Sequence, residues 1–292
     1  MKQLVVLSGK GGTGKTFVSA NLALQFKNTV AVDADVDAAN LNIILNGKTI
    51  KKELFQAGDE AFIEQYLCKA CGKCAGQCPY EAIRQQGSAY RIHHLLCEGC
   101  GICVDVCPEL AIKLAAKTSG CWYHGVLDNG KEIFHAELYP GQDNSGKLVT
   151  LLRQKAEEHA RNTAADLVLI DGPPGIACPA MAALTNTDYA LFVTEPSASA
   201  VQDLERLISL SASFYLKKAV VINKAGLNKN KETEIAQLCI KNGIPILASI
   251  PFSKTVPLSL QQPGAYADRY SDRVSEALLG LYRSLKTELG TM

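Results

Sequence analysis

The sequence predicts an α/β fold: a mostly parallel sheet covered by helices on both faces, interrupted by a small α+β domain. Apolar runs alternate with helical stretches, as expected for strands buried on both faces of a parallel sheet, and the runs are 167–170, 189–193, 219–222 and 246–250. Residues 58–116 instead form a short, internally repeated stretch that holds eight of the 11 cysteines. We therefore expect one discontinuous domain, residues 1–57 and 117–292, with residues 58–116 inserted into it.

The N-terminal residues predict the start of a βαβ unit. An apolar run ends in a glycine-rich turn, and a helical apolar pattern follows as far as Phe26. A second apolar run, 29–32, leads into Asp33, so two strands flank one helix. Further along, the stretch Asp128-Asn129-Gly130 predicts the tight turn of a hairpin over residues 123–139.

Composition and charge exclude several classes of protein. The 292 residues are 47% hydrophobic and 20% charged, which excludes a disordered chain. Lys and Arg number 30 and Asp and Glu number 29, a net charge of +1 that argues against a nucleic-acid partner. No run of about 18 apolar residues occurs, so we expect no stable membrane insertion. The first strand begins too early for a signal peptide and the thiols suit a reducing compartment, so we expect a cytoplasmic location.

A phosphate-binding loop is predicted between the first strand and the first helix, the context that this motif requires. Its residues fit G-x-x-x-x-G-K-[ST] at every fixed position and read Gly9-Lys10-Gly11-Gly12-Thr13-Gly14-Lys15-Thr16. The glycines let backbone N–H groups turn toward phosphate oxygens, and the helix N-terminus adds partial positive charge. We expect Lys15 to hold the β- and γ-phosphates and Thr16 to ligate Mg²⁺. The motif thus predicts a P-loop nucleoside triphosphatase.

The second lysine of the loop, Lys10, makes it similar to the deviant Walker A ATPases of the MinD/ParA superfamily. That family includes cell-division and partition ATPases, the nitrogenase iron protein and Mrp-type iron–sulfur carriers. The resemblance implies Mg²⁺-dependent hydrolysis of ATP in a dimer that encloses the nucleotides. It also implies that Lys10 reaches the nucleotide of the partner subunit, either in a homodimer formed on ATP binding or in a heterodimer with a related ATPase.

The same resemblance implies roles for residues at later strand ends. Asp35 is similar to the residue that positions the attacking water, although Asp33 or Asp37 could serve instead, because three carboxylates lie within five residues. Further matches imply that Asp171 lies near Mg²⁺, that Asn223 reads the adenine and that Pro251 forms the other side of the base pocket.

The inserted stretch contains two copies of the bacterial ferredoxin pattern C-x-x-C-x-x-C-x-x-x-C-P. In this pattern three thiolates of one run bind a cluster and the fourth thiolate comes from the other run. We expect one [4Fe–4S] cluster on Cys68, Cys71, Cys74 and Cys107, and a second [4Fe–4S] cluster on Cys97, Cys100, Cys103 and Cys78. Zinc is the competing metal, because C-x-x-C pairs also bind it.

Together these motifs resemble the MinD-superfamily ATPases that contain an inserted, bacterial-ferredoxin-like domain with two clusters. Three functions follow as hypotheses. In the first, the ATP state of the dimer controls electron transfer or partner docking through the clusters. In the second, the chain is a positioning or assembly ATPase whose clusters sense redox state. In the third, it is an iron–sulfur cluster carrier. The partner is an unidentified redox or assembly protein.

Overall fold

The computed structural model describes residues 1–260 and 272–291, and the chain divides into two compact units. Unit 1 comprises Met1–Glu53, Trp122–Glu137 and Ser145–Met292. Unit 2 comprises Leu54–Cys121 and Leu138–Asn144. The boundaries that the sequence suggests for an inserted domain, residues 58–116, lie within unit 2, and the assignment of that segment as a separate domain remains a prediction.

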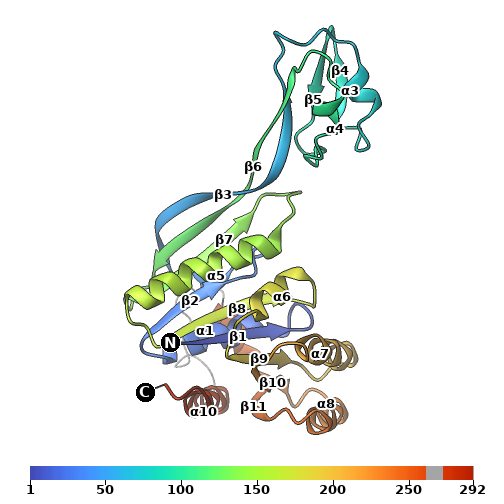
Figure 1. Cartoon of the computed structure of the whole chain (residues 1–292). Coiled ribbons are helices and arrows are strands. Elements are labelled where there is room, and N and C mark those ends of the chain that lie inside the picture. The colour runs from blue at the N-terminus through green and yellow to red at the C-terminus, as the bar shows by residue number, and fades with distance from the viewer. Residues whose placement is uncertain (261–271, 292) are drawn as a thin grey trace. The chain divides into compact units, whose positions relative to one another are not determined.

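The core of unit 1 is a parallel sheet (Figure 1). The full sheet has the order β11-β10-β9-β1-β8-β2-β7-β6-β3. Each pair of neighbouring strands from β11 through β7 is parallel, which confirms the predicted α/β class. The strands of this part are β1 (Lys2–Ser8), β2 (Thr29–Asp33), β7 (Glu132–Leu138), β8 (Leu167–Pro174), β9 (Tyr189–Thr194), β10 (Lys217–Ala225) and β11 (Ile246–Pro251).

Helices cover both faces of this sheet, as the continuous apolar strands require. Successive strand residues point to opposite faces, so Leu4 and Val6 share one face and Val5 and Leu7 the other. The first face packs on α1 (Lys15–Gln25) and α10 (Asp272–Leu289). The helix α5 (Ser145–Asn162) packs against β2 and β8, and α6 (Cys178–Leu184) packs against β8 (Figure 1). The remaining helices of unit 1 are α2 (Leu41–Ile44), α7 (Ala198–Ser211), α8 (Lys229–Lys241) and α9 (Thr255–Leu260).

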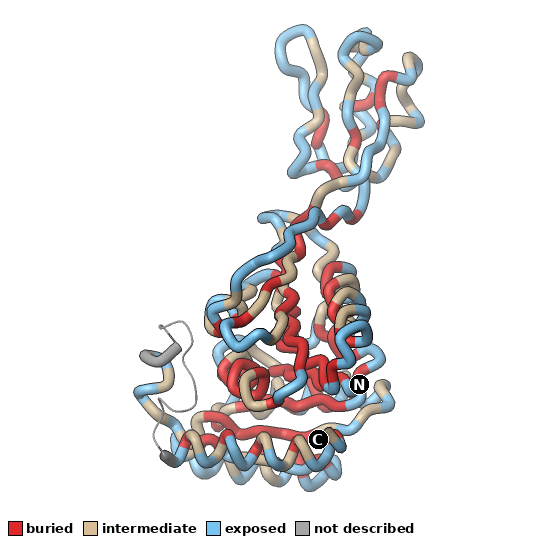
Figure 2. The backbone as a smooth tube through the Cα atoms, turned by 90° about the vertical axis from the view of Figure 1, so that its left-hand side faces the viewer, coloured by how far each residue is buried: buried red, intermediate tan, exposed pale blue. Residues whose placement is uncertain are grey.

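Burial follows the central strands, as Figure 2 shows. Every residue of β2 and β9 is buried, although β2 ends in the charged residue Asp33. Such complete burial removes strand side chains from water on both faces and stabilises the sheet by about 25 cal/mol per Å² of apolar surface. The same strands therefore hold any polar residue at their ends in a fixed position.

One small motif occurs twice in unit 2. Two short helices, α3 (Lys73–Gly76) and α4 (Ile102–Asp105), each begin just after a left-handed glycine, Gly72 or Gly101. Glu81 and Leu110, each the third residue after the last cysteine of a run, both have positive φ. The antiparallel pair β4 (Ile83–Gln86) and β5 (Ala89–Ile92) lies between the two helices in the sequence. The sequence duplication is thus also a duplication of backbone conformation.

Two long strands, β3 (Lys48–Ile63) and β6 (Ile112–Val126), belong partly to each unit. β6 is joined to β7 by the tight turn that the sequence predicts at 128–130. There the Gly130 N–H donates to the Leu127 carbonyl at 2.9 Å, and the Leu127 N–H donates to the Lys131 carbonyl at 2.7 Å.

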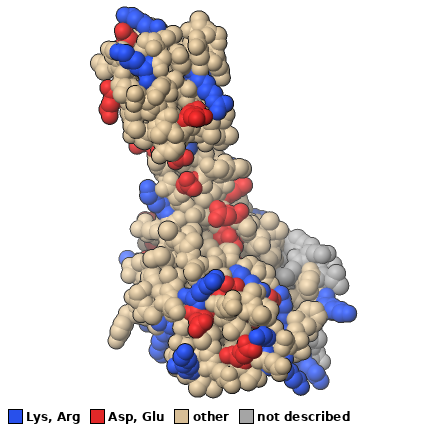
Figure 3. Space-filling model, turned by 90° about the vertical axis from the view of Figure 1, so that its right-hand side faces the viewer, with Lys and Arg blue, Asp and Glu red and all other residues tan. Residues whose placement is uncertain are grey.

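The surface of unit 1 carries charges of both signs. On the face drawn in Figure 3, basic and acidic side chains are interspersed. Within the part of the chain that the structure describes, no helix is long and apolar enough to cross a membrane.

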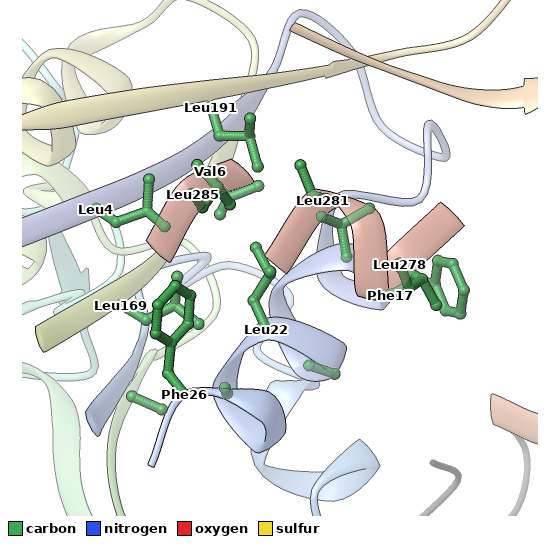
Figure 4. Close-up of a cluster of buried hydrophobic side chains, with 14 of the residues drawn as sticks. Leu4, Val6, Phe17, Leu22, Phe26, Leu169, Leu191, Leu278, Leu281 and Leu285 are labelled. Atoms are coloured by element: carbon green, nitrogen blue, oxygen red, sulfur yellow. The ribbon is translucent and has the colours of Figure 1, made fainter. Parts of the chain in front are cut away.

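Figure 4 shows the cluster in which α1, α10 and the sheet meet. Leu278 of α10 is fully buried in this cluster, whereas its neighbour Leu279 is 41% exposed. Leu278→Ala should therefore lower the free energy of unfolding of unit 1 by about 2–5 kcal/mol, because it removes buried methyl groups and leaves a cavity. Urea unfolding of both variants would measure this effect. Leu279→Ala is the control and should change stability by about 0.5 kcal/mol or less; equal losses in the two variants would contradict the packing described.

Candidate nucleotide site and cysteine hollows

The phosphate-binding loop connects the end of β1 to the start of α1. Gly14 precedes α1 with φ of 92°, a left-handed conformation that favours glycine. A Cβ at this position would lie 2.1 Å from Nδ2 of Asn223. That nitrogen donates to the Thr13 carbonyl at 2.8 Å, so Asn223, on β10, holds the loop from the side. Gly9 is equally restricted, because a Cβ there would lie 2.5 Å from Cβ of Asp203.

Lys15, the first residue of α1, is buried and faces carboxylates. Its Nζ is 3.0 Å from Oδ1 of Asp171 and 3.9 Å from Oδ2 of Asp35. The Ser19 hydroxyl also donates to Oδ1 of Asp171, at 2.7 Å. The structure therefore brings Lys15, Asp35 and Asp171 together, from three segments far apart in the sequence.

Two oxygens of the loop and of Asp171 are buried without a hydrogen-bond partner in the described structure: Oγ1 of Thr13 and Oδ2 of Asp171. Burying such polar atoms is costly unless a ligand satisfies them. A carboxylate oxygen is a preferred ligand of Mg²⁺, and a hydroxyl can donate to a phosphate oxygen. Thr16, the other predicted Mg²⁺ ligand, is half-buried one residue after Lys15. These donors and acceptors fit a bound Mg²⁺–nucleotide.

The three carboxylates after β2 have different surroundings. Asp33 is fully buried and accepts the Leu41 N–H at 2.8 Å and the Asp35 N–H at 3.3 Å. Burial, with the charge of Asp171 adding to it, raises the pKa of Asp33 to about 7. Burial also raises the pKa of Asp35, while Lys15 opposes the shift. Asp37 is exposed. Asp33 thus shapes the loop, and Asp35 is the carboxylate that lies near Lys15.

Lys10 is held within its own chain. Its Nζ lies 2.7 Å from Oε1 of Glu195 and donates to the hydroxyls of Ser197 and Ser199, at 3.1 and 2.9 Å. Oε2 of Glu195 accepts a hydrogen bond from Nζ of a second lysine, Lys224, at 2.6 Å. Burial alone would raise the pKa of Glu195, but the two lysines hold this pKa below its ordinary value.

Sequence reasoning missed five residues around the phosphate loop: Ser19, Glu195, Ser197, Ser199 and Lys224. The sequence contains a pattern that could have identified Glu195. This residue directly follows an apolar strand, and Asn223 likewise lies near the end of one. In an open parallel sheet, ligands bind beyond the carboxyl ends of the strands.

A cavity of about 230 Å³ adjoins the loop and is formed by two strand ends. Asn223 and Pro251, the predicted base-pocket residues, both line it, as do Gly12, Gly14, Phe17 and Phe252. The cavity combines an amide with apolar and aromatic walls, which suits a flat heteroaromatic ring. Gly11 lies in the exposed part of the loop.

Unit 2 brings eight of its nine cysteines together around two hollows. Cys68, Cys71 and Cys74 line one hollow with Cys107 of the other run. The second hollow is lined by Cys97, Cys100, Cys103 and Cys78. These sets have the same members as the two predicted ligand sets, and the assignment of the metal remains a prediction.

The thiols around the hollows are free, and several are buried. Burial, with neighbouring thiols adding to it, raises the pKa of Cys103 to about 11, and burial also raises the pKa of Cys74. Two sulfurs accept backbone hydrogen bonds: the Ala61 N–H donates to Cys97 at 3.4 Å and the Ala111 N–H to Cys107 at 3.3 Å. Thiolates bound to a cluster commonly receive hydrogen bonds of this kind. The donor set therefore fits a thiolate-bound metal centre.

Comparison with known proteins identifies the class of the chain. The family model of the CobQ/CobB/MinD/ParA nucleotide binding domain matches residues 4–262. The uncharacterized protein MJ0578 of Methanocaldococcus jannaschii is 34% identical over 293 residues, which are 97% of this chain and 96% of that protein. The septum site-determining protein MinD of Neisseria meningitidis serogroup B is 25% identical over 314 residues, which are 98% of this chain and 93% of that protein.

Solved structures share the fold. The MinD cell division protein of Aquifex aeolicus has a TM-score of 0.58 at 20% identity, with 98% of each chain covered. MinD of Pyrococcus horikoshii, solved in complex with Mg-ADP, has a TM-score of 0.58 at 19% identity, with 99% of this chain and 97% of that chain covered.

The fold and the site define a P-loop nucleotide-binding ATPase similar to MinD and ParA. The chain belongs to the CobQ/CobB/MinD/ParA nucleotide-binding family. This confirms the predicted superfamily and P-loop fold. The iron–sulfur clusters and the individual roles of the site residues remain predictions.

Asp35→Ala should slow ATP hydrolysis by about 100-fold or more while leaving ATP binding intact, because it removes only the carboxylate expected to position the water. Phosphate release and binding of a fluorescent ATP analogue would measure the two effects separately. Asp37→Ala, a change at the exposed carboxylate of the same loop, is the matched control. If Asp37→Ala abolished turnover and Asp35→Ala did not, the assignment within this loop would be wrong.

Proposed function

We propose that this chain is an ATP-hydrolysing iron–sulfur protein in which the ATP state of a dimer controls electron transfer or partner docking through two [4Fe–4S] clusters. One observation carries the proposal: a family ATPase site and two hollows, each with four cysteines in a three-plus-one arrangement, occur on one chain. Zinc sites seldom combine three cysteines at x-x spacing with a fourth from a duplicated run, so the pattern favours clusters. When bound, such clusters supply one-electron transfer.

In the proposed reaction, this chain's residues bind and orient the nucleotide. Lys15 leaves Asp171 and takes the β- and γ-phosphates, which exchanges one buried ion pair for another. Oδ2 of Asp171 and the Thr16 hydroxyl would hold Mg²⁺, and the Thr13 hydroxyl would donate to a phosphate oxygen. Asp35 orients the water for in-line attack on the γ-phosphorus. The catalysis asked of the protein is positioning and charge stabilisation, as in other phosphoryl transfers.

Dimer formation is the proposed link between nucleotide and clusters. Lys10 can reach a partner subunit only after it leaves Glu195. Its contacts with Glu195 and two serines set a cost for release, which the γ-phosphate of the partner's ATP would offset. Two segments begin at strand ends that lead to the phosphate site. One is residues 33–40, which precede β3 in the chain, and the other is formed by the residues after Asp171. A γ-phosphate would order these segments in the ATP state and release them after hydrolysis.

A positioning or assembly ATPase with redox-sensing clusters is the second candidate. Its support is the similarity to septum site-determining proteins over nearly the full chain. In this candidate the clusters report redox state to a protein partner, and ATP turnover drives binding and release.

Protein purified without oxygen should contain about eight iron atoms per chain, because each [4Fe–4S] cluster holds four. Iron analysis would measure this, and Cys74→Ser should lower the iron content by about half, whereas Cys239→Ser, at a buried cysteine outside unit 2, should not. Cluster iron near zero, with zinc on the thiolates instead, would contradict the proposal.

A redox titration of the same protein separates the two candidates. The first candidate requires the potential of at least one cluster to differ between the nucleotide-free, ADP and ATP states. Linkage then requires the ATP affinity to differ between the oxidised and reduced protein by the same free energy. Identical potentials in all three states would favour the positioning ATPase.

Lys10→Ala should weaken ATP-dependent dimerisation at least tenfold, because it removes the cation expected to cross the interface. Light scattering at several protein concentrations would measure the dimer in the presence of ATP. The control is Lys27→Ala, which removes an exposed lysine just after α1 and should leave dimerisation unchanged. A chain that stays monomeric in every nucleotide state would argue against the gated dimer.

A further inference from the structure

A cluster of metal-ligating side chains lies in unit 1, apart from the phosphate loop and from the eight cysteines. His124 comes from β6, Glu132 from β7 and His159 from α5. Their ligand atoms all lie within 4.8 Å of one another. Nε2 of His159 is 2.6 Å from Oε2 of Glu132, and Nε2 of His124 contacts the same oxygen. Two imidazole nitrogens and one carboxylate oxygen therefore converge on one point.

We propose that His124, Glu132 and His159 form a zinc site that leaves the fourth coordination position open. Two histidines and a glutamate, with water as the fourth ligand, are a donor set that zinc uses when the metal keeps an open position. With neutral imidazoles, the three ligands carry one negative charge against the two positive charges of the ion. The bound metal would therefore retain a net positive charge and attract water, hydroxide or another small anion.

The geometry lies close to what zinc requires. Zn–N and Zn–O bonds of about 2.0–2.1 Å in a tetrahedron place ligand atoms about 3.3 Å apart. Nε2 of His159 and Oε2 of Glu132 would have to separate by about 0.7 Å from their 2.6 Å spacing. Side-chain rotation alone can supply such a shift, because the three side chains are only half-buried, between 14% and 28% exposed.

Neighbouring rings fix the direction of the imidazoles. The His124 ring stacks on Phe134 with 4.4 Å between centroids and 7° between planes. The His159 ring lies 4.9 Å from His124 and 5.6 Å from the same Phe134. Phe134 is buried, so both imidazoles rest on a rigid surface. Preorientation of this kind lowers the entropy lost when a metal binds.

Two of the nearby lysines contact groups other than Glu132, whereas a third, Lys27, is exposed and lines the same cavity as Glu132 and His159. Lys131, adjacent to Glu132, donates from Nζ to the carbonyls of Ala23 and Leu24 at 2.9 and 2.7 Å. Lys155, one turn before His159, pairs with Glu158 at 3.7 Å.

A cavity of about 230 Å³ borders Glu132 and His159 and is lined also by Asn28, Asn129 and Thr163. It has room for a water molecule on the metal and for a small polar ligand beside it. The site uses none of the residues that the ATPase proposal uses, so the two inferences stand or fall separately.

A hydrogen-bonded cluster is the competing account. In that account each imidazole donates its Nε2–H to Glu132, whereas metal binding requires the Nε2 lone pairs to be free. The two accounts therefore differ in whether the chain binds a metal through nitrogen and oxygen.

The test uses the full chain with its cysteine sites loaded with iron, so that thiolates do not compete for the added ion. Zn²⁺ or Co²⁺ is added to one equivalent, and bound metal is measured by equilibrium dialysis, by the visible spectrum of Co²⁺ and by X-ray absorption of Zn²⁺. We expect one equivalent with a first shell at about 2.0–2.1 Å from nitrogen and oxygen and without the shell at about 2.3 Å that thiolates produce. The absence of an equivalent with this nitrogen and oxygen shell would overturn the proposal, whether or not thiolates also bind the added ion, and this measurement needs no variant.

Variants then test the ligands. His159→Gln and Glu132→Gln should each lower metal affinity by more than about 100-fold, since even changes behind the ligands cost about 10- to 100-fold. Glu158→Gln, beside His159 on α5, and His94→Gln, an exposed histidine of unit 2, are the matched controls and should bind as the unaltered chain does. Unchanged affinity in the first pair would overturn the assignment of these ligands. ATP turnover should remain in all four.

Discussion

The buried ion pair between Lys15 and Asp171 is the contact around which unit 1 is organised. The pair joins the start of α1 to β8, and β8 lies between β1 and β2 in the sheet. A buried lysine without a carboxylate would cost several kcal/mol, so the chain must bring these residues together once the sheet has formed. Ser19 adds a hydrogen bond to the same carboxylate. The energetic demand of one buried charge thereby sets the position of the phosphate loop.

This arrangement also explains why the site is incomplete without a ligand. One oxygen of Asp171 and the hydroxyl of Thr13 remain buried and unpaired in the described structure. Asp35 adds a second carboxylate, whose Oδ2 lies 3.9 Å from Nζ of Lys15. A lysine shared between carboxylates can be transferred to phosphate at lower cost than one held in a single ideal pair. The site therefore contains buried polar atoms without partners, and Mg²⁺ and a nucleotide would supply those partners.

Unit 2 follows a different physical principle. Three of the seven buried residues in its apolar cluster are cysteines, namely Cys74, Cys97 and Cys103. A unit of this size buries a smaller share of its surface than a large domain does, and metals commonly add stability to small domains. If the clusters are present as proposed, they replace part of a core. The loss of iron would then unfold unit 2 while leaving the sheet of unit 1 intact.

Sequence alone determined the α/β class, the phosphate loop between a strand and a helix, and the duplicated cysteine runs. It could do so because each depends on short-range spacing: apolar periodicity, the positions of glycines in one loop, and thiols two or three residues apart. The pairing of Lys10 with Glu195, the burial that separates Asp33 from Asp35, and the convergence of His124, Glu132 and His159 were decided by tertiary structure. Each of these joins residues from strands and helices that are distant along the chain, and their proximity depends on strand order and register. No local pattern encodes that order, because it results from packing the whole sheet against its helices.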